Sequence, residues 1–413
     1  MSIFEPLTLG YDWEVWALKH EMQPGDEKKV EKIADRVNEE LAPIECHREW
    51  HFIEMGPAVT RDWTELRERT NRYVDWVQAE FAKEELFFYP CGAIVSEHGT
   101  AGLHIHVGTV GDAESEVRVV NALVRYIPAL LALMVNSPVS HWRHGKSKSY
   151  RMNHPWGSGG VYSVTQPHLC NAIDWGDVCF RRSDKPTIEI RLADSCMSTR
   201  LLCEYAVVVA GLVDWIATHP EDAPASYTEA EYTEFLIDRW QATKHGLQAT
   251  FTSGGVAISA ADGVREIIDK ATAGMRKLGA SVEDLVVIPK MLEKRQTQAD
   301  FQLAYLEHYP DLIGFTHAFA NVLTDLSAFE RYLDMARALP QSEPTDLDEA
   351  ILEKIGRDTS LSGLTTDPFI PPVLLERRLR ALESAGRISV KTTPEDGIKC
   401  SRLQSSAAPL PGR

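Results

Sequence analysis

The sequence has few of the features of secreted or thiol-rich proteins. Its seven cysteines are scattered through 413 residues, and no two of them form a Cys-x-x-Cys pair. An odd number of dispersed thiols in a long chain is typical of a reducing compartment, and it argues against a disulfide framework or a zinc ribbon. The opening residues, MSIFEPLTLG, have neither the basic nor the apolar region of a secretory signal. We therefore expect a cytoplasmic protein.

Long hydrophobic runs and an excess of positive charge are also missing. The most apolar stretches, NALVRYIPALLALMV and YAVVVAGLVDWIA, are too short to cross a bilayer, and each carries a charged residue. The 43 basic residues are outnumbered by 60 acidic ones, which gives a net charge of −17. This balance argues against binding to nucleic acid or to an anionic membrane. A phosphate-bearing substrate would need cations placed locally.

The order of alternating and helical patterns predicts an α+β fold. Strands are expected over 7–16, 48–55, 86–95, 102–109, 177–182 and 186–192, and helical spacing dominates from about Thr199 to Leu339. This order favours an antiparallel or mixed sheet over a doubly wound fold. We expect one catalytic domain over 1–340, a small helical appendage over 341–390 and, by composition, a disordered tail over 391–413.

Four of the expected strands carry polar side chains at a spacing of two, which places them on one side of a strand. These groups are Asp12 with Glu14, Glu54 preceded by Glu49 and His51, His104 with His106, and Glu189 with Arg191. Each group alone is ordinary on a solvated sheet face. Four of them in one domain would form a face that is costly to bury unless cations neutralise it.

The chemistry of these side chains indicates phosphoryl transfer. Oxygen ligands with few thiols suit Mg²⁺, with Mn²⁺ as a further possibility. Arg191 could hold a phosphate through two hydrogen bonds. Carboxylates, divalent cations and arginine together describe a site where charge neutralisation and positioning do most of the work. The sequence contains no GxxxxGK[ST] loop, which excludes a P-loop enzyme.

Seven short motifs, in order over residues 8–300, resemble the glutamate–cysteine ligase type 2 family of carboxylate–amine ligases. They are LGYDWEVW, AGLHIHVG, IPALLALMVNSP, SKSYR, WGDVCFRRSDKPTIEIRLAD, WQATKHGLQA and KRQTQ. The resemblance implies a glutamine synthetase-like domain. In such a domain a curved antiparallel sheet forms a funnel, packed by helices, that holds ATP and two or three divalent cations.

The resemblance also implies roles for individual residues. The expected metal ligands are Asp12, Glu14, Glu49, Glu54, His104 and Glu189. The expected nucleotide-binding residues are His104, His106, Arg182 and Arg191. The expected catalytic residues are Glu54, Arg151, which would lie near the acidic substrate, and Arg191, which would lie on the transferred phosphate.

The implied reaction joins an acid, glutamate or a related amino acid, to an amine. The acid's carboxylate, the γ-carboxylate if the acid is glutamate, attacks the terminal phosphate of ATP, and the amine then displaces phosphate from the acyl phosphate to leave an amide. Asp12 stands where the family usually has glutamate, and the spacing from Glu49 to Glu54 is short for the family, so cysteine is not assumed to be the amine. Homo-oligomers are possible.

The residues alone leave two alternative functions open. A metal-dependent hydrolase could use His104 and His106 as ligands of zinc or iron. A catalytically degenerate protein of the same fold could serve only for binding, because Asp12 departs from the family pattern. Turnover of ATP in the presence of acid, amine and Mg²⁺ would separate the ligase from both.

Overall fold

The computed structural model describes most of the chain, and it divides the chain into two compact units. The described residues are 5–96, 99–108, 113–140, 143–145, 147–153, 177–180, 186–219, 227–253, 256–355, 370, 372–393 and 397–402. The first unit is Met1–Glu343 and the second is Pro344–Arg413. Each unit is described by itself.

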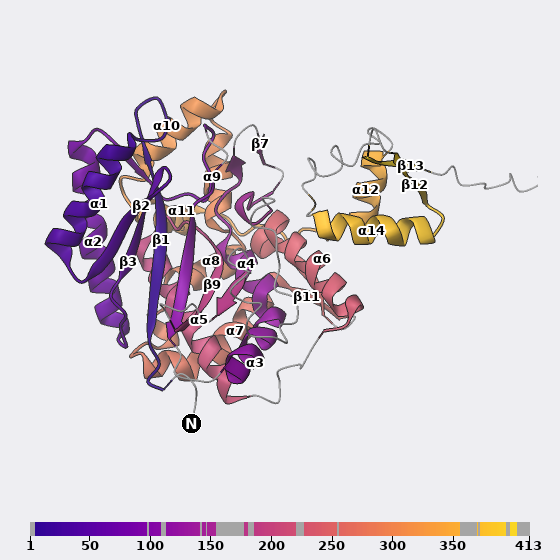
Figure 1. Ribbon diagram of the computed structural model, residues 1–413, viewed down its shortest axis with the longest axis horizontal. Helices are drawn as coiled ribbons and strands as arrows, with labels where there is room; N and C mark the ends of the chain where they lie inside the picture. The colour runs from indigo at the N-terminus through magenta and orange to yellow at the C-terminus, as the bar shows by residue number, and fades with distance from the viewer. Residues whose placement is uncertain are drawn as a thin grey trace, which may run out of the picture. The chain divides into compact units, whose positions relative to one another are not determined.

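The first unit is built on one antiparallel sheet of seven strands (Figure 1). Along the sheet the strands are β2 (Ile44–Glu49), β3 (Phe52–Pro57), β1 (Leu9–Leu18), β5 (Gly102–Gly108), β9 (Thr187–Asp194) and β8 (Val178–Phe180), and β4 (Phe87–Tyr89) also pairs with β1. The predicted strand over 86–95 is therefore much shorter in the structure.

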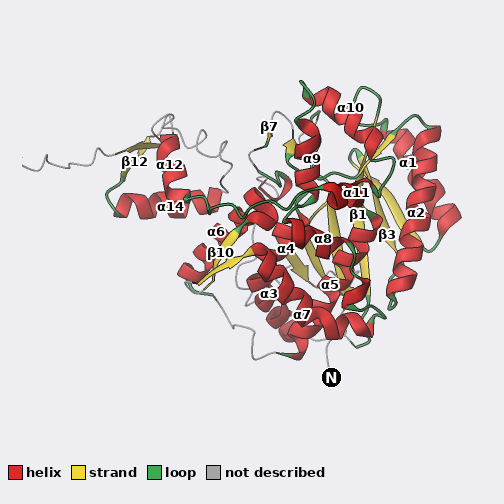
Figure 2. Cartoon of the chain, turned by 180° about the vertical axis from the view of Figure 1, so that it is seen from behind, coloured by secondary structure: helices red, strands yellow, loops and turns green. Residues whose placement is uncertain are grey.

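One face of this sheet is apolar and carries the main core. Tyr11 and Trp13 of β1 are buried on this face, where the Tyr11 hydroxyl hydrogen-bonds Thr70 Oγ1 on α2 (Trp63–Lys83) at 2.7 Å. Helix α5 (Thr199–Thr218) packs against β1 and β5 on the same face. In Figure 2 helices α5 and α7 lie on the side of the sheet that faces the viewer. Because side chains alternate along a strand, Asp12, which lies between Tyr11 and Trp13, points to the opposite face.

The other elements of the first unit are mostly helices, as the sequence predicts from Thr199 onward. They are α1 (Glu27–Leu41), α3 (Ala113–Leu123), α4 (Ile127–Met134), α6 (Glu229–His245), α7 (Ala260–Lys277), α8 (Val287–Lys294), α9 (Gln298–Leu306), α10 (Leu312–Val322) and α11 (Ala328–Met335). The short strands β6 (Val139–Ser140) and β7 (Arg143–His144) form one hairpin, and β10 (Thr250–Ser253) and β11 (Val256–Ser259) form another.

Two apolar helical stretches are core elements. The stretches Glu114–Met134 and Thr199–Thr218 are long enough to cross a membrane, so the expectation that both were too short is wrong. However, 83% of each is buried inside the protein, as in the core helices of a soluble protein. The first stretch is interrupted by a 3₁₀ turn at Val124–Tyr126, and Pro128 lies in the first turn of α4, where a missing N–H costs nothing.

The second unit combines two helices with a hairpin. Helices α12 (Leu347–Ile355) and α14 (Pro372–Ser384) are joined by an ion pair in which Arg378 donates to both carboxylate oxygens of Asp348, at 2.8 and 2.6 Å. Strands β12 (Ile388–Thr393) and β13 (Gly397–Arg402) pair antiparallel. This hairpin enters the range where the composition predicts a disordered tail.

Candidate active site

The register of the sheet gathers the predicted polar residues on the face opposite α2 and α5. Glu14 lies opposite Glu54 across β1 and β3, and Asp12 lies opposite His104 across β1 and β5. His106 lies opposite Glu189 across β5 and β9. Directly opposed residues share a face. We call the face formed by Asp12, Glu14, Glu54, His104, His106, Glu189 and Arg191 the acidic face.

His104 lies at the centre of the acidic face. Its Nδ1 is 3.5 Å from Glu189 Oε1, and its Nε2 is 3.8 Å from Glu14 Oε1. Arg151 Nη2 approaches His104 Nε2 at 3.2 Å. Because a guanidinium can only donate, this contact requires Nε2 to accept, so that the imidazole proton lies on Nδ1 toward Glu189. His104 therefore links carboxylates from two strands to the loop that carries Arg151.

His106 holds Asp12 in place. Its Nε2 lies 3.0 Å from Asp12 Oδ2 and its Nδ1 lies 3.0 Å from Thr187 Oγ1. Both ring nitrogens are thus engaged by protein groups, so that His106 fixes the position of the Asp12 carboxylate. Asp12, His106 and Thr187 also line a cleft of about 570 Å³.

Two arginines supply the positive charge at this face. Arg191 forms an ion pair with Glu189 on the same strand. Burial is the largest single effect on Arg191 and lowers its pKa, but the negative charges around it, Glu189 foremost, together raise the pKa above its ordinary value. Arg151 Nη1 donates to the backbone carbonyl of Arg191 at 3.0 Å, and burial lowers the pKa of Arg151. Arg151 and Arg191 are therefore adjacent.

Among the residues that the structure describes, the carboxylates of the acidic face outnumber its arginines. Burial, followed by the charges of Asp12 and Glu14, raises the pKa of Glu54 to about 9. Burial also raises the pKa of Glu14 to about 7, with Arg151 opposing the shift and Glu49 adding to it. Full ionisation of these groups near neutral pH needs additional positive charge. Clustered carboxylate oxygens are the donors that Mg²⁺ and Mn²⁺ prefer, so the donor set fits divalent cations.

The acidic face continues onto β2 through His47 and Glu49. His47 lies opposite Glu54 in the β2–β3 hairpin, and its Nε2 is 3.5 Å from Glu54 Oε1. Ligand atoms of His47, Glu49 and Glu54 all lie within 4.8 Å of one another. His47 is absent from the predicted set, although its spacing of two from Glu49 could have revealed it. His51, which the sequence also singles out, lies in the turn between β2 and β3.

Asp194 anchors the loop of Arg151 and is also absent from the predicted set. This fully buried carboxylate accepts hydrogen bonds from the backbone N–H of Asn136 at 2.5 Å, Ser137 Oγ at 2.8 Å and Ser149 Oγ at 3.0 Å. Burial raises the pKa of Asp194 to about 6 in spite of these bonds. A buried aspartate at the end of β9 therefore fixes the segment two residues before Arg151.

A second buried acid fixes strand β8. Asp177 accepts from Arg239 Nη2 at 2.7 Å and from Nε at 2.8 Å, and Arg239 belongs to α6. The carbonyl of Asp177 accepts from the backbone N–H of Arg191 at 3.0 Å. Helix α6 is thereby connected to the strand that carries Arg191. Arg182, a predicted nucleotide-binding residue, lies outside the described residues.

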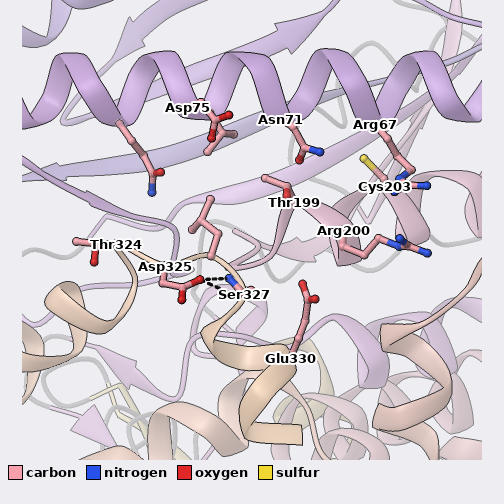
Figure 3. Close-up of a pocket in the computed structure, with 13 residues that line it drawn as sticks. Arg67, Asn71, Asp75, Thr199, Arg200, Cys203, Thr324, Asp325, Ser327 and Glu330 are labelled. Atoms are coloured by element: carbon pink, nitrogen blue, oxygen red, sulfur yellow. Dashed lines mark hydrogen bonds between the residues drawn. The ribbon is translucent and has the colours of Figure 1, made fainter. Parts of the chain in front are cut away.

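A separate cavity of about 510 Å³ lies on the helical side of the sheet, between α2, α5 and the segment leading into α11 (Figure 3). Its charged lining residues bond largely to protein groups. Arg200 donates to Glu204 and to the carbonyl of Asp284, and Asp325 accepts from Ser327 and pairs with Arg331. This cavity is not part of the acidic face.

Comparison with known proteins finds a similar fold and similarity to one protein family. The model of the glutamate–cysteine ligase family 2 (GCS2) matches residues 70–158. A protein of Rhodococcus jostii (strain RHA1), named "Putative glutamate–cysteine ligase 2-1", is 33% identical over 180 residues, which cover 39% of this chain and 48% of that protein. The chain thus aligns with about half the length of this relative.

A longer alignment and a solved structure extend the comparison. A "Putative glutamate–cysteine ligase 2" of Salmonella agona (strain SL483) is 22% identical over 377 residues, covering 78% of this chain and 98% of the relative. The crystal structure of a glutamate–cysteine ligase from Francisella tularensis in complex with AMP matches with a TM-score of 0.53 at 9% identity, over 92% of this chain and 94% of that one.

The antiparallel sheet packed by helices and the match to a solved ligase define the class. The protein has the α+β fold of the carboxylate–amine ligases, as predicted. Within that class, the predicted resemblance to the glutamate–cysteine ligase 2 family is confirmed by the family match over 70–158.

Proposed function

We propose that the protein is a cytoplasmic ATP-dependent carboxylate–amine ligase that forms an amide, with glutamate as the acid, and releases ADP and phosphate. The main support is the acidic face itself. Carboxylates from β1, β3 and β9 converge there beside Arg151 and Arg191, in a family whose relatives are named as glutamate–cysteine ligases.

The chemistry explains why a ligase needs such a face. An ionised carboxylate is a poor electrophile, so an amine does not attack it at neutral pH. Transfer of the terminal phosphate of ATP to the carboxylate oxygen gives an acyl phosphate, whose phosphate leaves when the amine attacks the acyl carbon. The first transfer brings a triphosphate and a carboxylate together, so repulsion between anions is the main barrier to overcome.

The side chains divide this work by their charge and position. Arg191 would contact the oxygens of the transferred phosphate, and its ion pair with Glu189 would fix the direction of the guanidinium. Arg151, which contacts both His104 and the Arg191 carbonyl, would face the acid substrate. In other enzymes the loss of one such stabilising donor lowers the reaction rate about 10²–10³-fold.

The expected cation ligands are the oxygens of Asp12, Glu14, Glu49, Glu54 and Glu189, with His104 as a nitrogen ligand. Bound divalent cations would neutralise the phosphate oxygens as charge develops. The raised pKa values of Glu14 and Glu54 support this assignment, because a bound cation would favour the ionised form of these two buried carboxyls. His106 would orient Asp12 rather than bind metal, since Asp12 Oδ2 lies 3.0 Å from its Nε2.

The test is an assay of ADP formation over a panel of acids and amines with Mg²⁺, followed by mass spectrometry of the product. We expect ADP release to require both an acid and an amine, with glutamate the preferred acid, and we expect the product mass to be that of the dehydrated pair. Failure to bind ATP with Mg²⁺ would support a binding protein instead. Retention of zinc without ATP turnover would support a hydrolase.

A further inference from the structure

We propose that His47, Glu49 and Glu54 form one metal site that selects a first-row transition ion such as Mn²⁺ over Mg²⁺. The proposal rests on the proposed function and deepens it, because Glu54 belongs to the acidic face and Glu49 and Glu54 are among the expected cation ligands. His47 lies outside the predicted ligand set, and it would control which metal the site prefers.

The geometry of the β2–β3 hairpin brings the three side chains together. His47 and Glu54 are direct cross-strand partners, and Glu49 lies two residues beyond His47 on the same side of β2. Their ligand atoms lie within 4.8 Å of one another. Ligand atoms on a common ion at about 2.1 Å lie at most about 4.2 Å apart, so small side-chain rotations would complete the site.

Burial and charge differ across the three ligands in a way that suits a partly hydrated ion. Glu54 is buried beside Asp12 and Glu14, whereas the His47 side chain is 57% exposed. An ion at this position would neutralise Glu54 from its outer side and keep water molecules on the side toward solvent.

The imidazole supplies the selectivity. Mg²⁺ demands a near-ideal octahedron of oxygens and gives up its water reluctantly, so a nitrogen ligand adds little to its binding. First-row transition ions accept imidazole readily, and their affinity for such mixed sites exceeds that of Mg²⁺. Two carboxylates with one imidazole therefore favour Mn²⁺ over Mg²⁺, whereas three carboxylates would not.

The experiment measures Mn²⁺ binding to the full-length, nucleotide-free protein by electron paramagnetic resonance, with Mg²⁺ as competitor. We expect His47→Ala to weaken one Mn²⁺ site by at least about 10-fold, the size seen when groups supporting a metal are lost, while Mg²⁺ affinity changes much less. His47→Glu should narrow the preference for Mn²⁺ by restoring an all-oxygen site. The proposal would be overturned if His47→Ala bound Mn²⁺ as tightly as the wild type does and also bound Mg²⁺ as tightly.

His51→Ala is the matched control, because His51 lies in the turn between the same strands but outside the triad. It should bind Mn²⁺ like the wild type, and an equal loss in both variants would refute a specific role for His47. The ADP assay separates this proposal from the proposed function. Loss of a Mn²⁺ site in His47→Ala without any ligase activity in the wild type would leave the metal site standing and refute the ligase.

Discussion

Glu189 lies beside Arg191 and His104 at the acidic face, and the loss of its charge should mainly reduce catalysis. We expect Glu189→Gln to reduce ADP formation at least about 10²-fold, because the variant keeps the shape of the side chain but loses the charge that fixes Arg191. Circular dichroism should show an unchanged fold. Glu39→Gln on the exposed side of α1 is the control and should be fully active. Full activity of Glu189→Gln would refute its assignment to the site.

The raised pKa values of Glu14 and Glu54, about 7 and about 9, predict an unusual pH dependence of stability. Between pH 5 and 9 the folded protein holds more protons on these groups than the unfolded chain does. The free energy of unfolding should therefore fall as the pH rises through this range in a chelator. Added Mg²⁺ or Mn²⁺ should raise the melting temperature most at the alkaline end. A melting temperature in chelator that rises from pH 5 to pH 9 would contradict this account.

The sequence allowed the central carboxylates to be found, because a spacing of two on a strand assigns a face. It could not give the partner of each side chain, which depends on register. The contact of Arg151 with His104, and the anchoring of the Arg151 loop by Asp194, join segments about 45 residues apart. The spacing of two between His47 and Glu49 could have indicated His47, but its pairing with Glu54 depends on the register of the hairpin.

At the scale of elements, the ion pair between Asp177 and Arg239 connects α6 to the strands β8 and β9. Both side chains are almost fully buried, at 0% and 2% exposed. Arg239→Ala would leave the Asp177 carboxylate buried without its cation. We expect the free energy of unfolding to drop by about 3–5 kcal/mol, measured by urea denaturation.

The control for this pair is an exposed ion pair between an arginine and a carboxylate. Arg118 and Glu114 on α3 are 49% and 85% exposed. Arg118→Ala should cost no more than about 1 kcal/mol. If Arg239→Ala and Arg118→Ala lowered the free energy of unfolding equally, burial would not determine how strongly the Asp177–Arg239 pair stabilises the protein.

Helical periodicity predicted the helices well, and two local breaks lie close to prolines. The 3₁₀ turn at Val124–Tyr126 falls just before Pro128, which the sequence predicts as a kink because a proline ring interrupts the helical hydrogen bonds. Strand β4 covers only Phe87–Tyr89, and Pro90 follows it directly, where a residue without an N–H cannot continue the ladder.

At the scale of the whole molecule, the excess of acidic residues lies entirely in the first unit, because residues 344–413 carry ten acidic and ten basic residues. The last described contacts of the first unit are made by Gln341 with Thr250 and by Ser342 with the carbonyl of Gln248. A chain ending at residue 343 keeps both contacts. We propose that the catalytic domain ends here.

We expect the truncated chain 1–343 to fold and to form ADP at the rate of the full-length protein, since every predicted site residue lies within it. Thermal unfolding and the ADP assay test this. Aggregation of the truncated chain, or loss of its activity with an intact fold, would show that residues 344–413 contribute to the site. The polar linker near 341 predicts a boundary at this point, but the sequence gave no sign of the hairpin β12–β13.

The account depends on transfer of phosphate from ATP to a substrate carboxylate at the acidic face. The most direct test uses the acid selected by the ADP assay, labelled with ¹⁸O in its reacting carboxylate, together with ATP, Mg²⁺ and the amine. An acyl phosphate requires one labelled oxygen to pass to the released phosphate, and mass spectrometry should detect it. Amide formation with unlabelled phosphate would contradict the proposed mechanism.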